Sequence, residues 1–213
     1  MGTGSVPGEA ALKSSYEKPD FWAQKAKKEG YPARSVYKLA EIDEKFHLLG
    51  KAPRILDIGA APGSWSLWIL KRLGGAGFLA AVDLQALGIT PPHPNFRFIQ
   101  GDLFDPRVRA ELAALGPFDL VVSDAAPATT GNRLVDQGAS EAIVEAVGSY
   151  ARQCLVPGGA LVVKLFQGGS ERELIEDLRR DFAQVRGFKP KACRSESFET
   201  YLVASGFKRT RGS

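Results

Sequence analysis

The chain contains few of the residues that build metal sites, disulfides and membrane spans. Its two cysteines, Cys154 and Cys193, lie far apart without CxxC spacing, and its only histidines are His47 and His93. This supply cannot form a histidine-rich metal site, and it makes a zinc site or a structural disulfide unexpected. No stretch approaches the roughly 20 apolar residues that span a bilayer, and the N-terminus lacks the basic-then-apolar pattern of a signal peptide. We therefore expect a cytoplasmic protein that uses no metal ion.

Length and composition predict a single α/β domain. The chain has 213 residues, and 44% of them are apolar, which is enough material for one buried core. Residues 1–19 are rich in Gly, Ser and Pro without periodicity, so we expect them to be disordered. The remainder divides into two N-terminal helices within residues 20–50, a main domain over residues 51–207 and a basic tail over residues 208–213.

Basic residues are concentrated at the two ends of the chain. The net charge is +4, but residues 186–213 alone carry seven basic residues against two acidic ones. Another five basic residues lie between residues 25 and 38, interleaved with Tyr31 and Tyr37. Such clusters favour a polyanion such as RNA as the partner, and they place the two N-terminal helices on the surface that meets it. A solvated helix face and a soluble tail are the alternative that composition leaves open.

The main domain alternates short apolar runs with amphipathic segments. Nearly continuous apolar runs are typical of buried parallel strands, and their alternation with helices indicates a doubly wound sheet with helices on both faces. The last two apolar runs have no helix between them, so we expect a hairpin that puts one antiparallel strand into an otherwise parallel seven-stranded sheet. The predicted strands are residues 54–58, 78–83, 96–100, 120–123, 160–166, 184–188 and 198–204, and the predicted helices are residues 20–28, 33–48, 64–73, 106–115, 136–155 and 170–182.

The first of these strands runs into a turn of small residues, in the sequence RILDIGAAPGSWS of residues 54–66. Gly59 and Gly63, with two alanines between them, allow the backbone to approach a ligand closely, and Ser64 can cap the helix that follows. A turn of this kind at the carboxyl end of a strand predicts a nucleotide-like ligand.

Acidic side chains follow three other predicted strands at the same edge of the sheet. Asp83 lies twenty residues after Gly63, the spacing at which an acid reaches ribose hydroxyls in related folds. Asp102 can accept a hydrogen bond from an adenine amino group, although an aspartate before a helix commonly caps that helix. Asp124 directly follows an apolar strand, where an acid is rarely structural. We expect all three to face the ligand.

Two residues near the C-terminal strands have both a functional and a structural interpretation. Lys164 interrupts the apolar run VVKLF, so it either takes part in chemistry or extends its ammonium group to water from a packed stem. We favour chemistry for Lys164. Glu199, taken alone, is an outward-facing residue of an alternating strand.

Taken together, these segments resemble one known family. The motifs are SVYKL at residues 35–39, DIGAAPGSWS, DAAP at residues 124–127, VVKLFQG and ETY at residues 199–201. They resemble the FtsJ family of S-adenosylmethionine-dependent RNA ribose 2′-O-methyltransferases, and most of all the members that methylate a uridine of large-subunit ribosomal RNA. The likeness implies a Rossmann-like methyltransferase fold, S-adenosylmethionine as the cofactor, and RNA of the assembled large ribosomal subunit as the partner of a monomeric enzyme.

The resemblance also implies a role for individual residues. Two departures from the family pattern are Ser64, where many members have a second glycine, and Cys193 in the loop before the last strand. The implied catalytic residues are Lys38, Asp124, Lys164 and Glu199, and the implied cofactor-binding residues are Gly59, Gly63, Trp65, Asp83, Asp102 and Asp124.

For this reaction, the enzyme must mainly align the reactants and activate the ribose hydroxyl. A sulfonium already makes its leaving group neutral, so no metal is needed, but a 2′-hydroxyl is a poor nucleophile at neutral pH. Lys164 can act as a neutral base or as a cation that stabilises the attacking oxygen. Two acids beside two lysines favour the charged forms, so we expect the cation.

Other functions share part of the pattern. A nicotinamide-dependent oxidoreductase has the same fold unit, but GAAPG lacks the G-x-G-x-x-G fingerprint. A methyltransferase of base amino groups would follow its acid with two prolines and an aromatic residue, whereas AAPA follows Asp124. A transfer RNA 2′-O-methyltransferase and a non-catalytic RNA-binding ribosome-assembly protein are the remaining alternatives.

Overall fold

The computed structural model of the protein defines where the predicted elements lie. The expectations for residues 1–19 and for the tail beyond Lys208 fall outside the described residues. Within the described part of the chain, no helix combines the length and the apolar character that crossing a bilayer requires. The described residues are 21–50, 53–89, 94–128, 130–168, 171–194 and 197–208.

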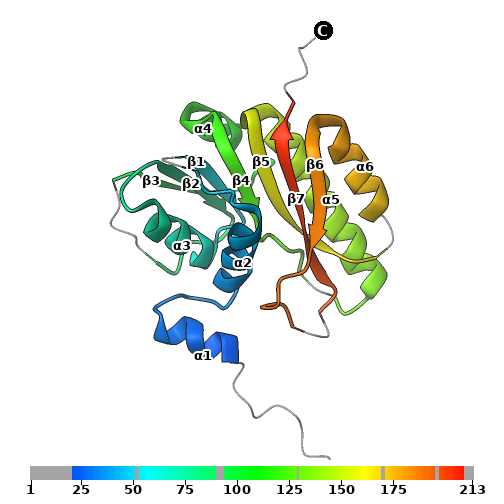
Figure 1. Ribbon diagram of the computed structural model, residues 1–213, viewed down its shortest axis with the longest axis horizontal. Helices are drawn as coiled ribbons and strands as arrows, with labels where there is room; N and C mark the ends of the chain where they lie inside the picture. The colour runs from blue at the N-terminus through cyan, green and yellow to red at the C-terminus, as the bar shows by residue number, and fades with distance from the viewer. Residues whose placement is uncertain are drawn as a thin grey trace, which may run out of the picture.

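Seven strands form one sheet in the order β3-β2-β1-β4-β5-β7-β6 (Figure 1). Neighbouring strands are parallel from β3 to β5, whereas β7 is antiparallel to both β5 and β6. The predicted mostly parallel sheet and its C-terminal hairpin are therefore confirmed. The strands are β1 Arg54–Ile58, β2 Phe78–Asp83, β3 Phe96–Gln100, β4 Phe118–Ser123, β5 Leu155–Phe166, β6 Phe182–Phe188 and β7 Glu199–Phe207.

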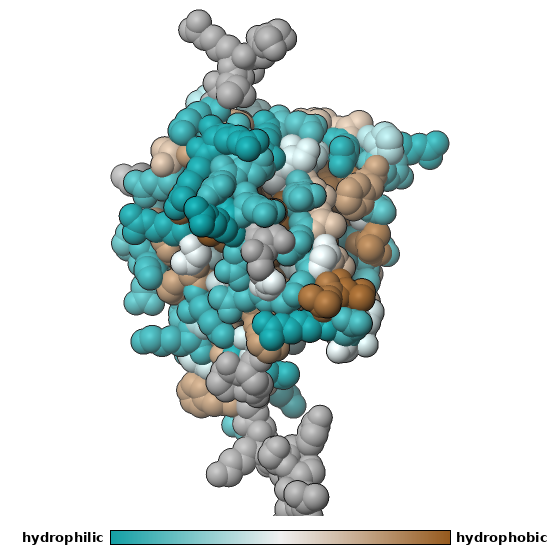
Figure 2. Space-filling model, turned by 90° about the vertical axis from the view of Figure 1, so that its right-hand side faces the viewer, coloured by the Kyte–Doolittle hydropathy of each residue, from teal (hydrophilic) through white to brown (hydrophobic). Residues whose placement is uncertain are grey.

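Helices cover both faces of the sheet, as the strand–helix alternation predicted. Side chains of β1 alternate between two cores: Leu56 and Ile58 pack with α4, α5 and α6, while Ile55 packs with α2 and α3 on the other side. The view from the α6 side shows a mostly hydrophilic surface with small separate apolar patches (Figure 2), because the apolar residues Leu174 and Leu178 of α6 face the core. The helices are α1 Phe21–Lys28, α2 Val36–Phe46, α3 Ser64–Leu73, α4 Pro106–Leu115, α5 Arg133–Cys154 and α6 Glu171–Asp181.

Some element boundaries differ from the predicted ones for local reasons. α5 begins three residues earlier than predicted because the Asn132 side chain caps it, accepting a hydrogen bond from the Leu134 N–H at 3.1 Å. α2 is shorter than predicted and ends where His47 adopts the left-handed conformation, with φ of 51°. β5 begins five residues earlier because Leu155 pairs with Phe118 across an irregularity in β4.

α2 and the segment before it are attached to two distant parts of the chain. The Ala33 N–H donates to Ser64 Oγ at 2.7 Å, and Trp65 Nε1 donates to the Ser35 carbonyl at 2.8 Å. The Glu41 carboxylate accepts hydrogen bonds from two backbone N–H groups of the β6–β7 connection. The prediction that Ser64 caps α3 is therefore wrong: Gly63 is the N-cap, and the Ser64 hydroxyl instead holds the N-terminal segment. These bonds fix α2 relative to the sheet, and α1 lies beyond it at the lower edge in Figure 1.

Candidate active site

The four residues of the expected catalytic set come from four separate elements. Lys38 lies on α2, Asp124 directly follows β4, Lys164 lies near the end of β5, and Glu199 begins β7. The parallel pairing of β4 with β5 brings Ser123 beside Val163, so Asp124 and Lys164 continue from adjacent positions. The antiparallel pairing of β5 with β7 sets Lys164 opposite Tyr201. Strand register therefore brings these charges to one edge of the sheet.

The four charged groups form two ion pairs. Lys164 Nζ lies 3.0 Å from Asp124 Oδ1 and also donates to the main-chain carbonyl of Asp124. Lys38 Nζ pairs with Glu199 Oε1. All four side chains are between 9% and 18% exposed, so the pairs are largely shielded from water. The alternative interpretations are excluded, since Lys164 ends in an ion pair instead of extending into water, and Glu199 does not face outward.

Tyr201 joins the two pairs, and sequence reasoning did not assign it to the site. Its hydroxyl donates to Asp124 Oδ1 at 2.7 Å and lies 3.4 Å from Glu199 Oε1. The side chain is fully buried, and burial together with the Asp124 charge raises the pKa of the phenol well above its ordinary value. The hydroxyl therefore serves as a proton-bearing donor. The sequence feature that could have identified Tyr201 is its position two residues after Glu199, which puts both side chains on the same face of the strand.

The Glu199 carboxylate is held in its charged form. Burial alone would raise its pKa, but the Lys38 charge and the hydrogen bonds from Lys38 and Cys193 outweigh burial and lower it. The Cys193 thiol donates to Glu199 Oε1 at 3.1 Å, and burial and the nearby carboxylate raise the pKa of this thiol to about 12. Cys193 is therefore an inert donor to the site instead of a reactive thiol.

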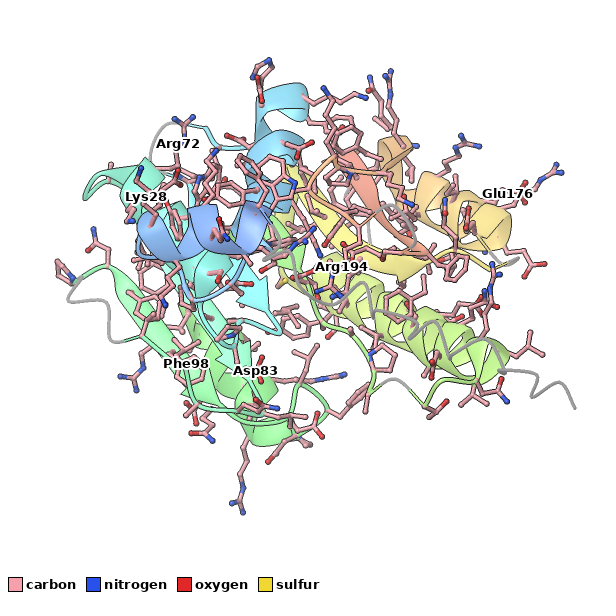
Figure 3. All side chains as sticks on the ribbon, turned by 90° about the horizontal axis from the view of Figure 1, so that it is seen from below. Lys28, Arg72, Asp83, Phe98, Glu176 and Arg194 are labelled. Atoms are coloured by element: carbon pink, nitrogen blue, oxygen red, sulfur yellow. The ribbon has the colours of Figure 1, made fainter. Side chains whose placement is uncertain are left out.

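A cavity of about 380 Å³ lies next to the ion pairs, at the carboxyl edge of β1, β2 and β4. Its size is within the range of roughly 300–1,000 Å³ that small-molecule pockets occupy. Of the predicted cofactor-binding residues, the four that line it are Gly59, Asp83, Asp102 and Asp124. Asp83 is labelled in Figure 3, which views this edge of the sheet from below.

Two predicted cofactor-binding residues lie outside the cavity lining. Trp65 is buried, with its Nε1 donating to the Ser35 carbonyl and its ring 5.8 Å from the Tyr201 ring centroid. Gly63 has a positive φ of 108°, and a Cβ there would lie 2.5 Å from the Ile89 side chain. Both residues pack against neighbouring side chains, and neither lines the cavity.

The small-residue turn is shaped by one close contact and one carboxylate. A Cβ on Gly59 would lie 2.6 Å from the Ala125 Cβ, so only glycine allows β1 and β4 to approach this closely at the cavity. Asp83 accepts hydrogen bonds from the N–H groups of Ala61 and Gln85, each at 2.8 Å. Its carboxylate therefore holds the turn in place while still facing the cavity.

Asp102 is available to a ligand because a different residue caps the next helix. Asp105 is the N-cap of α4, and its side chain accepts from the Arg107 N–H at 2.8 Å. Asp102 is exposed, and its Oδ1 accepts a hydrogen bond from the Phe104 N–H at 2.9 Å. The helix-capping alternative for Asp102 is therefore wrong.

The charges around the cavity select the kind of ligand that fits. Asp83, Asp102 and Asp124 contribute carboxylates, and the described lining residues include no lysine or arginine. This wall fits a nucleoside that carries hydroxyl groups and a positive charge, as S-adenosylmethionine does. It does not suit the pyrophosphate of a nicotinamide dinucleotide, which needs donors and positive charge around it. Across the described part of the chain, no cluster of three His, Cys, Asp or Glu side chains has a metal-binding arrangement.

Basic and aromatic side chains lie together on α1 and beside it. Lys25 Nζ is 4.6 Å from the Tyr37 ring centroid, and Lys71 Nζ is 4.1 Å from the Tyr31 ring centroid. Lys28 on α1 and Arg194 in the β6–β7 connection are both exposed, and Figure 3 shows them over the same edge of the molecule.

Asp57 is a buried acid at the end of the first strand, and sequence reasoning assigned it no role of its own. It lies on β1, is fully buried, and accepts a hydrogen bond from Ser66 Oγ at 2.6 Å on Oδ2. Its Oδ1 has no partner within the described residues. Burial, reinforced by the charges of Asp124 and Asp83, raises its pKa to about 7, although the Ser66 bond acts in the opposite direction.

Comparison with known proteins supports a methyltransferase. The model of the family described as FtsJ-like methyltransferase matches residues 31–207. The chain is 48% identical to ribosomal RNA large subunit methyltransferase E of Treponema denticola over 196 residues, which is 92% of this chain and 98% of that protein. The corresponding enzyme of Nitratidesulfovibrio vulgaris is 47% identical over 192 residues, with 89% of this chain and 94% of that protein covered.

Solved structures agree with the sheet described above. A Plasmodium falciparum protein described as a ribosomal RNA methyltransferase aligns with a TM-score of 0.74 and 32% identity, over 83% of this chain and 98% of that chain. Human methyltransferase-like protein 13 in complex with SAH aligns with a TM-score of 0.55 and 14% identity, over 84% of this chain and 81% of that chain. The second likeness concerns the fold alone.

Asp57 makes the stability of the fold depend on pH. Its pKa is about 7 in the folded protein against an ordinary value of 3.8, so the folded state binds this proton more tightly. The stabilisation is fully present below pH 4 and is lost as the pH rises through 7. Asp57→Asn cannot ionise, so its unfolding free energy relative to wild type should increase across this window, by at most about 4 kcal/mol. Urea denaturation at pH 5, 6, 7 and 8 measures the difference, and a value that does not change with pH would contradict this assignment.

Proposed function

The chain belongs to the FtsJ-like methyltransferase family, and from this premise we propose that it methylates the ribose 2′-hydroxyl of a uridine in large-subunit ribosomal RNA. S-adenosylmethionine is the methyl donor. The observation that carries the proposal is the set of two buried lysine–carboxylate pairs beside a carboxylate-lined cavity of nucleoside size. The names of the relatives support large-subunit ribosomal RNA as the substrate.

The cavity would hold the methyl donor through three carboxylates. When bound, S-adenosylmethionine supplies a methyl group on a positively charged sulfur, and the transfer leaves a neutral thioether. Asp83 would accept hydrogen bonds from the ribose hydroxyls, and Asp102 would accept one from the adenine amino group. Asp124 would face the sulfonium region, because it lines the cavity and also binds Lys164. The Gly59 turn would let the backbone pass close to the ligand.

Lys164 is the residue that would contact the reacting oxygen. Its ammonium is held by the carboxylate and the main-chain carbonyl of Asp124, so its direction is fixed before RNA arrives. A cation in this position would steer the 2′-hydroxyl and stabilise the negative charge that develops on its oxygen as its proton is released to bulk water. Lys164 and Asp124 are largely shielded from water, and this shielding strengthens the electrostatic stabilisation. The sulfonium makes its own leaving group neutral, so the mechanism assigns no step to a metal ion.

Lys38 and Glu199 would position the ribose. They form the outer pair of the site, and Tyr201 connects them to Asp124 through its hydroxyl. Their opposite charges cancel, so the site presents a fixed arrangement of donors and acceptors without a large net field. Such preorganisation reduces the reorganisation that the reaction would otherwise require.

The N-terminal helices would extend the RNA-binding surface. Lys27 and Lys28 on α1 are exposed, and so is Arg194 in the β6–β7 connection. Basic side chains near aromatic rings suit phosphates and unpaired bases of structured RNA. A large ribosomal particle offers many such contacts to a chain that acts as a monomer.

The substrate can be identified by methyl transfer to separate RNA samples. The protein and tritiated S-adenosylmethionine are incubated with isolated large subunits, naked ribosomal RNA or bulk transfer RNA. Labelled nucleotides are then tested for resistance to alkaline cleavage. We expect an alkali-resistant ribose in the large-subunit sample, because 2′-O-methylation removes the hydroxyl that alkaline cleavage needs. Label on a base, or label in transfer RNA alone, would overturn the proposal.

Replacing Lys164 separates catalysis from cofactor binding. Lys164→Ala should lower the single-turnover methylation rate by about 10²–10³-fold or more, because one charge-stabilising donor is lost. The cofactor dissociation constant should change little, since Lys164 is not among the residues that line the cavity. Lys45→Ala, an exposed position on the same helix as Lys38, serves as the matched control. A folded Lys164→Ala protein that has lost cofactor binding would sink this assignment.

A further inference from the structure

A second cavity lies beside the ion pairs, and none of the roles assigned above uses it. Its volume is about 290 Å³. This is smaller than the cofactor cavity and close to the lower limit of small-molecule pockets, so it suits one flat ring system. We name it the Phe198 cavity; it is lined by Gly131, Arg133, Asp136, Gln137, Phe166, Ser197 and Phe198.

The Phe198 cavity is directly connected to the catalytic groups. Phe166 is the register partner of Glu199 in the β5–β7 pairing, and Phe198 precedes Glu199 in the chain. Ser197 Oγ accepts a hydrogen bond from the Glu199 N–H at 3.2 Å. The cofactor cavity reaches the same ion pairs through Asp124. Residues that belong to the ion pairs or neighbour them therefore line both cavities.

The wall of the Phe198 cavity contains an exposed aromatic ring. Phe198 is 49% exposed, so its ring is accessible to a ligand from solvent. The Arg133 guanidinium lies 3.9 Å from the centroid of this ring and covers part of it. A cation–π contact at an exposed position is weak, so a planar ligand can displace the guanidinium and stack on the ring.

The charges of the cavity favour a base over a phosphate group. Asp136 accepts hydrogen bonds from the Thr130 N–H and hydroxyl, at 2.7 and 2.8 Å, and these bonds lower its pKa. A carboxylate in the wall repels a phosphate but accepts a hydrogen bond from an N–H group of a base. Arg133, displaced from the ring, can instead reach the phosphate that flanks the nucleotide.

We propose that the Phe198 cavity receives the base of the nucleotide that is methylated, unstacked from the RNA and lying against the Phe198 ring. This inference rests on the proposed function. The base is bonded to the sugar carbon next to the one that carries the 2′-hydroxyl, so it must lie close to Lys164 when that hydroxyl is in place. RNA targets are commonly recognised with the base turned out and stacked on an aromatic side chain.

The first test measures methylation of large subunits that lack the modification. Phe198→Leu keeps an apolar side chain but loses the flat ring, so kcat/KM for the subunit should fall by about five- to hundred-fold. Phe198→Trp should restore most of the rate, because it supplies a ring. The cofactor dissociation constant and the melting temperature should match wild type in both variants.

Arginine variants provide a matched control. Arg133→Gln should reduce kcat/KM for the subunit by a smaller factor than Phe198→Leu. Arg172→Gln removes a charge from α6, where the side chain is 89% exposed, and should have no effect. Unchanged kcat/KM in Phe198→Leu would overturn the inference, as would a loss that Phe198→Trp does not recover. If wild type labels no RNA at all, the proposed function itself fails.

A crosslinking experiment tests the same contact without a variant. A ribosomal RNA fragment carries 4-thiouridine at the methylated position, or at either neighbouring position, and is irradiated with the wild-type protein. We expect a crosslink to the peptide that contains Ser197 and Phe198 only from the methylated position. A crosslink to this peptide from a neighbouring position alone would show that another base occupies the cavity, and would overturn the inference.

Discussion

The antiparallel pairing of β7 with β5 is the constraint on which the site depends. It sets Lys164 opposite Tyr201 and Phe166 opposite Glu199, so one register decides which groups meet. A shift by one residue would turn Tyr201 and Glu199 to the other face of the sheet and break both contacts to Asp124 and Lys38. The buried apolar residues on both sides of these strands prevent such a shift, because it would move each of them into the opposite core, where the packing does not fit. The core therefore holds the reactive groups in place.

The two ion pairs are better explained by the positions in which they hold the reactive groups than by a contribution to the stability of the fold. Burying two lysines and two carboxylates costs desolvation energy, and the mutual attraction of the charges offsets this cost only when the geometry is good. The site satisfies that condition, since Asp124 receives both Lys164 and Tyr201 while Glu199 receives Lys38 and Cys193. Removing one member leaves another charge buried without its partner. The same contacts therefore fix both the positions of these four groups and their charge states.

The sequence predicted the sheet well because buried strands leave a local signal, whereas Lys38 and Glu199 were expected at the site only from the family resemblance. Apolar runs marked the strands, and Lys164 was conspicuous as a charge inside such a run. Tyr201 escaped notice because an aromatic residue in an apolar strand is typical of a core, and only the folded register shows that its hydroxyl meets Asp124. Trp65 was expected at the cofactor but packs against Tyr201, and Ser64 was expected as a cap but binds Ala33. Their partners are distant in sequence, so no local pattern could indicate them.

We expect Tyr201 and Asp124 together to hold the Lys164 ammonium for chemistry. The most direct measurement is the single-turnover methylation rate of Tyr201→Phe, taken alongside its cofactor dissociation constant. A hydrogen bond to a charged group contributes about 1.5–3 kcal/mol. If this contribution acts on the transition state, the rate should fall by about ten- to hundred-fold while cofactor binding and the melting temperature stay near wild type. A wild-type rate in the folded variant would show that the Tyr201 hydroxyl does not hold Lys164 for catalysis.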